Sequence, residues 1–112
     1  MIFSGDCFRV YVEDTDATGL VYHSRYLNFC ERARTMALTS KVEDQLAQLH
    51  QQGLYFVVAS IQAKYLLPLK LNDIFTVSIE EVAPHRGSID LTQKIVCQSR
   101  LCFSAKIKLA MI

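Results

Sequence analysis

An ordered run of acidic residues, a glycine and a histidine near the start of this chain could support attack on a carbonyl carbon. The run reads Tyr11-Val12-Glu13-Asp14-Thr15-Asp16-Ala17-Thr18-Gly19-Leu20-Val21-Tyr22-His23. The Asp16 carboxylate could act as a nucleophile or as a general base. Gly19 permits a sharp turn, and His23 lies where an amphipathic segment begins. Free backbone N–H groups at the start of a helix there could face the carboxylate and polarise the carbonyl.

The segments on either side of this run must position it. Apolar residues alternate from Phe8 to Val12, which predicts a first strand that ends at the acidic residues. Residues 15–19 are expected to form a loop. From about Tyr22 to Ser40, apolar residues recur at spacings of three and four, which predicts a helix with one apolar face. That face comprises Tyr26, Cys30, Ala33 and Ala37.

The rest of the chain predicts a short helix followed by strands. Residues 43–52 have a helical pattern that Gly53 should end, because glycine tolerates a left-handed backbone. Alternating apolar patterns follow, joined by turns at Asn72-Asp73 and at residues 85–88. Short turns imply antiparallel neighbours. We therefore predict an α+β fold, in which a curved antiparallel sheet of about five strands wraps around a central helix.

Length and composition limit the class of protein. The 112 residues are 51% hydrophobic and 21% charged, so we expect a single domain over residues 1–112. The formal net charge is +1 and both signs are spread along the chain, which argues against nucleic acid as a partner. No apolar run approaches the length of a membrane span, and the N-terminus lacks the pattern of a signal peptide.

The cysteines give no sign of a metal or redox site. Cys7, Cys30, Cys97 and Cys102 form no C-x-x-C pair and have no histidine at metal-ligand spacing. We interpret them as reduced, mostly buried side chains of a cytoplasmic protein. Neither a metal nor any other cofactor is expected.

The acidic run and the segment after it closely resemble a known family signature. The matching residues are Tyr11 to Asp16, Gly19, Val21-Tyr22-His23, Tyr26 and Phe29 to Arg34. They are similar to the 4-hydroxybenzoyl-CoA thioesterase branch of the hotdog-fold superfamily, and above all to the YbgC-type acyl-CoA thioesterases of bacteria. Weaker similarity continues through residues 65–68 and 72–73 and covers essentially the whole chain.

The resemblance implies an acyl-CoA thioester hydrolase in which Asp16 is the catalytic carboxylate. His23 is a further catalytic candidate, and in relatives a backbone N–H at its position polarises the thioester carbonyl. The resemblance also implies homodimers or homotetramers with the active site at a subunit interface, and an acyl carrier protein is a second candidate partner. In one departure, Val12 stands where YbgC-type relatives often carry a tyrosine assigned to the site.

Four further residues are predicted to contact the substrate. Gly19 would let the loop approach the thioester without a clash at Cβ, and the ring of Tyr22 would form part of a pocket wall. Arg86 and Ser88, in the turn at residues 85–88, could bind the phosphates or the pantetheine arm of CoA. Solvated surface charge is the competing interpretation for Arg86.

Each catalytic assignment has a structural alternative. Asp16 could simply begin a turn, and the side chain of His23 could orient Asp16 or the substrate, or cap the helix. Asp14 is expected to be solvated or bonded to the loop. Glu31 is expected to pair with Arg34 or Arg32 on the helix surface, although another branch of hotdog thioesterases uses a carboxylate on the central helix.

Two other functions compete with hydrolysis on the same fold. A non-catalytic module that binds acyl-CoA or acyl carrier protein stays open because Val12 offers no hydroxyl. A hydratase or dehydratase is disfavoured, because those enzymes resemble one another through a histidine on a Phe-Pro-bearing segment, whereas Ser24-Arg25 follow His23. The identity of the acyl group is not determined by the sequence.

Overall fold

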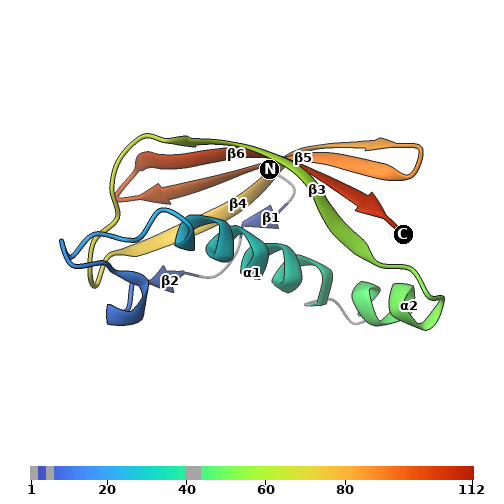
Figure 1. The fold of residues 1–112 in the computed structure, drawn as a ribbon, viewed down its shortest axis with the longest axis horizontal. Coiled ribbons are helices and arrows are strands. Elements are labelled where there is room, and N and C mark those ends of the chain that lie inside the picture. The colour runs from blue at the N-terminus through green and yellow to red at the C-terminus, as the bar shows by residue number, and fades with distance from the viewer. Residues whose placement is uncertain (1–2, 5–6, 40–43) are drawn as a thin grey trace.

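A curved antiparallel sheet arches over one long helix, which confirms the predicted α+β class (Figure 1). The computed structural model describes residues 3–4, 7–39 and 44–112. The helical elements are the 3-10 turn η1 (Val12–Asp14), α1 (Arg25–Thr39) and α2 (Gln45–Gln51). The strands are β1 (Phe3–Ser4), β2 (Phe8–Arg9), β3 (Phe56–Tyr65), β4 (Ile74–His85), β5 (Ser88–Cys97) and β6 (Arg100–Met111).

The strand order leaves β3 at one edge of the sheet. The order is β1-β4-β5-β6-β3, and the short β2 also pairs with β4. Tight hairpins join β4 to β5 and β5 to β6, whereas β3 follows α2 and pairs with β6 from Phe56↔Met111 to Tyr65↔Phe103. In the part of the chain that the structure describes, no strand covers the other edge of β3.

The first strand is shorter than expected, and α1 begins later. Val12 lies in η1, because the backbone N–H of Tyr11 donates to Oδ2 of Asp14 at 2.9 Å and closes this turn. The N–H of Tyr22 donates to the carbonyl O of Asp14 at 3.0 Å, which keeps residue 22 out of the helix. The expected strand through Val12 and the expected helix start at Tyr22 are therefore wrong at these ends.

The apolar face predicted for α1 packs against the concave side of the sheet. Tyr26, Phe29, Cys30 and Ala33 are buried on the helix. The sheet residues of the same core include Val77, Ile95, Phe103, Ala105 and Ile107. Because two of the helical positions are small, the helix can approach the sheet closely.

The short helix α2 ends as its pattern predicts. Oδ1 of Asp44 accepts from the N–H of Ala47 at 3.0 Å and caps the start. Gly53 follows the end with a φ of 75°, the left-handed conformation typical of a helix C-terminus. The predicted start at residue 43 lies outside the described residues. Within the described ranges, neither helix is long and apolar enough to cross a membrane.

A fully buried polar side chain, Gln93 of β5, ties the sheet to α1. Its Oε1 accepts from Nη1 of Arg34 at 2.8 Å, and its Nε2 donates to the carbonyl O of Cys30 at 3.0 Å. Among the described residues, no ion pair joins Glu31 to Arg34 or to Arg32. The expected surface pair does not form because Arg34 lies one turn after Cys30, on the side of α1 that faces the sheet.

Three of the cysteines lie where small apolar side chains are expected. Cys30, Cys97 and Cys102 are buried free thiols, whereas Cys7 is exposed. Burial raises the pKa of all three buried thiols, that of Cys30 to about 12. They therefore stay protonated and unreactive at neutral pH.

Replacing Gln93 by leucine should weaken the link between α1 and the sheet. We expect Gln93→Leu to lower the free energy of unfolding by about 1–3 kcal/mol, because the buried groups it served are left unpaired. Gln62→Leu, on the exposed strand β3, is the control and should change this free energy by no more than about 0.5 kcal/mol. Urea unfolding followed by circular dichroism measures both. Equal stability of the two variants would contradict the role given to Gln93.

Candidate functional site

The segment that holds the candidate carboxylate folds as a small hairpin. Thr15 pairs with Val21 in an antiparallel bridge. The N–H of Asp16 donates to the carbonyl O of Leu20 at 2.9 Å, and the N–H of Gly19 donates to that of Asp16 at 3.1 Å. Gly19 has a φ of 82°, which glycine adopts without strain. The expected loop at residues 15–19 is thus an ordered turn, with aspartate and glycine at their favoured positions.

The Asp16 carboxylate is exposed, and one of its oxygens is already hydrogen-bonded. Oδ1 accepts from the backbone N–H of Thr18 at 2.8 Å and from the Thr18 hydroxyl. These bonds, the hydroxyl bond foremost, lower the pKa of Asp16 below its usual value, so the group is ionised at neutral pH. The backbone N–H groups of Leu20 and of Asp16 itself add smaller contributions to the lowered pKa. Among the described residues, both of the hydrogen bonds that the Asp16 side chain accepts are made by Oδ1. Asp16 therefore begins a turn, as the structural alternative predicts, and the turn leaves one carboxylate oxygen available to a reactant.

The neighbouring Asp14 is buried and structural. Its Oδ1 accepts from Nε and Nη2 of Arg25 at 3.0 and 2.7 Å, and its Oδ2 accepts from the N–H of Tyr11. Only 3% of the side chain is exposed. These bonds join the turn η1 to the first residue of α1. The expectation that Asp14 bonds to its loop is correct, and the alternative that it is solvated is wrong.

His23 lies in the turn between the hairpin and α1. Its exposed ring contacts the ring of Tyr22, with centroids 4.3 Å apart. Among the described residues, no acceptor pairs with the backbone N–H of His23, and no contact joins its ring to the Asp16 carboxylate. The open N–H expected near the helix start is therefore present, although α1 itself begins at Arg25.

An apolar groove of about 340 Å³ opens beside His23. It is walled by the hairpin, the first turn of α1 and the segment after β3, through Val21, His23, Tyr26, Tyr65, Leu66, Leu67 and Pro68. The Tyr65 hydroxyl donates to the carbonyl O of His23 at 2.8 Å. The Tyr26 hydroxyl accepts from the N–H of Leu69 at 2.9 Å. The groove thus places apolar walls beside an open backbone donor.

Two of the predicted substrate contacts belong to this end of the molecule. Gly19 closes the turn that begins at Asp16, and it is exposed. Tyr22 is also exposed, by 48%, and its ring lies tilted against that of His23. Gly19 and Tyr22 thus lie in the same exposed segment as Asp16 and His23.

The other two predicted contacts lie at the far end of the sheet. Arg86 and Ser88 are in the β4–β5 hairpin, which Figure 1 shows opposite the loop that precedes α1. Ser88 pairs with Ala110 of β6, whereas Tyr65 at the groove pairs with Phe103 of the same strand. The seven positions from 103 to 110 span roughly 23 Å. One chain does not bring this hairpin to the groove.

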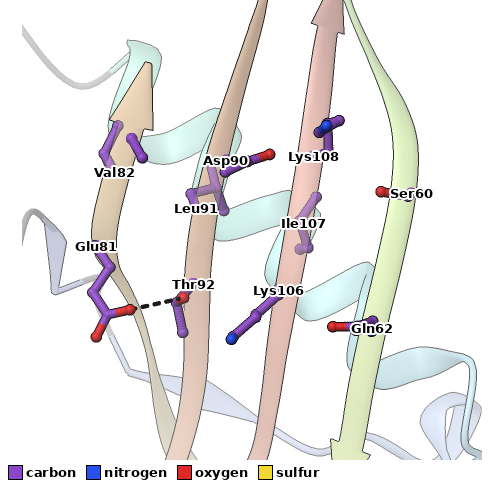
Figure 2. A pocket seen from close by; sticks show the side chains of 11 residues that line it. Ser60, Gln62, Glu81, Val82, Asp90, Leu91, Thr92, Lys106, Ile107 and Lys108 are labelled. Atoms are coloured by element: carbon purple, nitrogen blue, oxygen red, sulfur yellow. Dashed lines mark hydrogen bonds between the residues drawn. The ribbon is translucent and has the colours of Figure 1, made fainter. Parts of the chain in front are cut away.

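A second hollow, of about 470 Å³, lies on the outer face of the sheet. Figure 2 shows it on the side away from α1, with β4, β5, β6 and β3 running across it. Its polar side chains include Ser60, Gln62, Glu81, Asp90, Thr92, Lys106 and Lys108. None of the predicted site residues lines this hollow, so it is separate from the groove beside His23.

Tyrosine side chains shape the groove in ways that the sequence only partly predicts. Tyr26, which the sequence predicts on the apolar face of the helix, lies in the core and also lines the groove, with 3% exposure. Tyr65 was expected only as a strand residue. Its sequence signals are its place at the end of an apolar alternation and the weak family similarity of residues 65–68. Its bond to His23 joins residues 42 positions apart, which no local pattern reveals.

This end of the molecule carries an apolar groove, which His23 with its open amide N–H helps to line, and the exposed, ionised carboxylate of Asp16, which is not one of the groove's lining residues. This set suits attack on the carbonyl of an apolar acyl group, because the donor can stabilise the oxygen on which charge develops. Within residues 3–4, 7–39 and 44–112, no three His, Cys, Asp or Glu side chains are grouped so as to hold a metal ion.

Known proteins resemble this chain over most of its length. A family model, the thioesterase-like superfamily, matches residues 10–112. The acyl-CoA thioesterase YbgC of Haemophilus influenzae is 38% identical over 104 residues, which are 93% of this chain and 76% of that protein. The acyl-CoA thioester hydrolase YbgC of Escherichia coli O6:H1 is 41% identical over 79% of this chain and 65% of that protein. The solved structure of the "Probable Thioesterase" from Bartonella henselae has a TM-score of 0.85 at 30% identity, covering 98% of this chain and 90% of that one.

The hydrogen bond from the Thr18 hydroxyl should be measurable as a shift in acidity. Thr18→Val removes the largest cause of the lowered pKa, so the pKa of Asp16 should rise towards the usual aspartate value. A carbon-13 NMR titration of the carboxylates measures this change. Thr39→Val, which removes an exposed hydroxyl at the end of α1, is the control and should leave the Asp16 titration where it is. An unchanged Asp16 pKa in Thr18→Val would refute the assignment.

Proposed function

This chain belongs to the thioesterase-like superfamily and has a hotdog fold, and we propose that it hydrolyses an acyl-CoA thioester to a carboxylic acid and CoA. The matched family model and the two YbgC relatives confirm the resemblance of the sequence to the YbgC type of the 4-hydroxybenzoyl-CoA thioesterase family. The proposal depends above all on the open backbone N–H of His23 beside the apolar groove. The acyl chain would lie in this groove, and its carbonyl oxygen would accept from that N–H.

Asp16 would supply the carboxylate in one of two ways. As a general base, it takes a proton from water while the water oxygen bonds to the carbonyl carbon. As a nucleophile, its Oδ2 forms that bond, the C–S bond breaks to give a mixed anhydride and the CoA thiolate, and water then hydrolyses the anhydride. In both routes charge develops on the carbonyl oxygen, where the N–H of His23 stabilises it. The C–S bond then breaks, and CoA leaves as a thiolate that takes up a proton.

We infer that two copies of the chain associate along β3. This edge strand exposes apolar side chains, with 40% of Val57, 44% of Val58 and 38% of Ile61 accessible. An open apolar edge is a template for pairing with another strand. A homodimer, or a homotetramer built from such dimers, would cover it.

Pairing along β3 would also complete the site. If β3 pairs antiparallel with its copy, the Tyr65 end of one strand lies beside the Phe56 end of the other. The Phe56 end of β3 lies close to the β4–β5 hairpin of its own chain, with β6 between them. Met111 of β6 pairs with Phe56, and its N–H donates to the carbonyl O of Gly87 in the hairpin at 3.0 Å. The hairpin of one subunit would then lie near the groove of its partner. Arg86 and Ser88 could contact CoA across this interface.

The second candidate function is a non-catalytic module that binds acyl-CoA or acyl carrier protein. Val12, which replaces a tyrosine often found in YbgC-type relatives, is 72% exposed and offers no hydroxyl. If turnover requires that hydroxyl, the chain would bind its thioester without cleaving it. The activity measurement below separates the two functions.

We place the protein in the cytoplasm. Its four cysteines are free thiols, which suits a reducing compartment.

Removing the charge of Asp16 should abolish most of the hydrolysis. We expect Asp16→Asn to lower kcat/KM by about 100-fold or more, because neither route works with an amide. The measurement is CoA release from a panel of short aliphatic, long aliphatic and hydroxybenzoyl thioesters. Asp44→Asn, at the exposed N-cap of α2, where asparagine caps as well as aspartate, is the control and should keep wild-type rates. Binding without turnover by the wild type would favour the module, and full activity of Asp16→Asn would exclude Asp16 as the catalytic carboxylate.

A charge on the free edge of β3 should separate the subunits. We expect Ile61→Lys to reduce the solution mass to the 12.7 kDa of one chain, because two lysines would face each other along the paired edges. Light scattering after size exclusion measures the mass. Ile74→Lys, at a position 50% exposed on another strand, is the control and should leave the oligomer intact. A wild type that elutes as a single chain would refute association along β3.

A further inference from the structure

We propose that Tyr65 is a positioning residue for the hydrolysis, because its hydroxyl holds the peptide that follows His23 in the orientation needed to receive the thioester oxygen. The inference rests on the proposed function and adds a residue to it. Tyr65 would not touch the reacting atoms. It would act through the backbone at the entrance of α1.

The contact joins two separate parts of the chain at the groove. Tyr65 is the last residue of β3, and its hydroxyl donates to the carbonyl O of His23 at 2.8 Å. Both residues line the apolar groove. The bond therefore connects the edge strand to the turn from which the oxyanion donors project.

The two peptides on either side of His23 are both held at their carbonyl ends. The carbonyl O of Tyr22 accepts from the N–H of Arg25 at 2.9 Å. That carbonyl shares its peptide group with the N–H of His23. In the same way, the carbonyl O of His23 shares its peptide group with the N–H of Ser24, and it accepts from Tyr65.

Holding a carbonyl has two effects on the N–H of the same peptide. It fixes the direction of the N–H, and it polarises the group so that the N–H becomes a stronger donor. Among the residues that the structure describes, neither the N–H of His23 nor that of Ser24 has an acceptor. Two pre-oriented donors thus remain open, one on His23, which lines the groove, and one on the exposed residue that follows it, Ser24. The Tyr65 hydroxyl holds the peptide of the second donor.

Aromatic contacts keep the hydroxyl of Tyr65 in place. Its ring meets the ring of Tyr26 edge-on, with centroids 5.3 Å apart, and that of Phe103 at 5.0 Å. Tyr26 and Phe103 are buried, whereas Tyr65 is 49% exposed. Removal of the hydroxyl alone should therefore leave the ring packing intact.

The predicted effect is on turnover rather than on binding. An oxyanion donor contributes most when charge has developed on the oxygen, and loss of a whole donor costs roughly 100- to 1,000-fold in kcat. Tyr65→Phe leaves both N–H donors present and removes only the hydrogen bond that orients the peptide carrying the second donor. We expect kcat to fall about 10-fold, while KM stays within about twofold of the wild type.

The matched control is Tyr55→Phe. Tyr55 is 47% exposed, lies just before the other end of β3, and rests its ring on His50 with centroids 4.8 Å apart. No hydrogen bond of its hydroxyl is found among the described residues. This variant should keep the kcat, the KM and the melting temperature of the wild type. Equal kcat for Tyr65→Phe and Tyr55→Phe, with active wild type, would overturn the proposal.

A spectroscopic measurement tests the same role without turnover. Infrared spectroscopy can follow the carbon-13-labelled carbonyl of an acyl-CoA bound to Asp16→Asn. The stretching frequency should fall on binding, and adding Tyr65→Phe should move it back towards the free value, because one donor is weakened. An identical frequency with and without the Tyr65 hydroxyl would also overturn the proposal. Absence of hydrolysis by the wild type would instead refute the proposed function.

A further variant tests whether a lower kcat of Tyr65→Phe comes only from a loss of stability. If Tyr65→Phe lowers the melting temperature markedly, a variant with 4-aminophenylalanine at position 65 restores a donor on the same ring. Recovery of kcat in that variant supports positioning through the hydrogen bond. A kcat that stays low in a variant as stable as the wild type would contradict it.

Discussion

The buried carboxylate of Asp14 is the interaction on which the arrangement of the site depends. It accepts hydrogen bonds from the N–H of Tyr11 and from the guanidinium of Arg25. One side chain therefore fixes both the entry to the hairpin and the start of α1. A buried charge is tolerated only when it is paired and hydrogen-bonded, so this geometry has few alternatives. Asp14 is thus committed to the structure, whereas Asp16 stays exposed.

The contacts that hold α1 on the sheet also fix the position of the groove. Gln93 bonds to the helix backbone at Cys30 and to Arg34, and the small residues of the buried face allow close packing. The first turn of α1 is thereby held against the end of β3. At that point Tyr65 reaches the carbonyl of His23. The backbone groups are satisfied on their carbonyl sides and left open on their N–H sides, as a carbonyl-binding site requires.

A single chain contains only part of what the proposed reaction needs. The groove and Asp16 belong to one end of the sheet, while Arg86 lies in the hairpin at the other. The free edge of β3 runs between these ends and exposes apolar side chains. Association along this edge would bury that surface and bring the two ends together. In this view the same strand serves both assembly and substrate binding.

Local patterns in the sequence determined the α+β class, the buried face of α1 and the turn from Asp16 to Gly19. These features depend on the spacing of neighbouring residues, and so the sequence alone predicts them. Three features were decided only by the tertiary structure. Asp14 is buried whereas Asp16 is exposed, Arg34 bonds to Gln93, and α1 begins at Arg25. Two aspartates in one run look alike until packing decides which of them loses water. The bond between Tyr65 and His23 likewise exists only because the sheet curves over the helix and brings distant segments into contact.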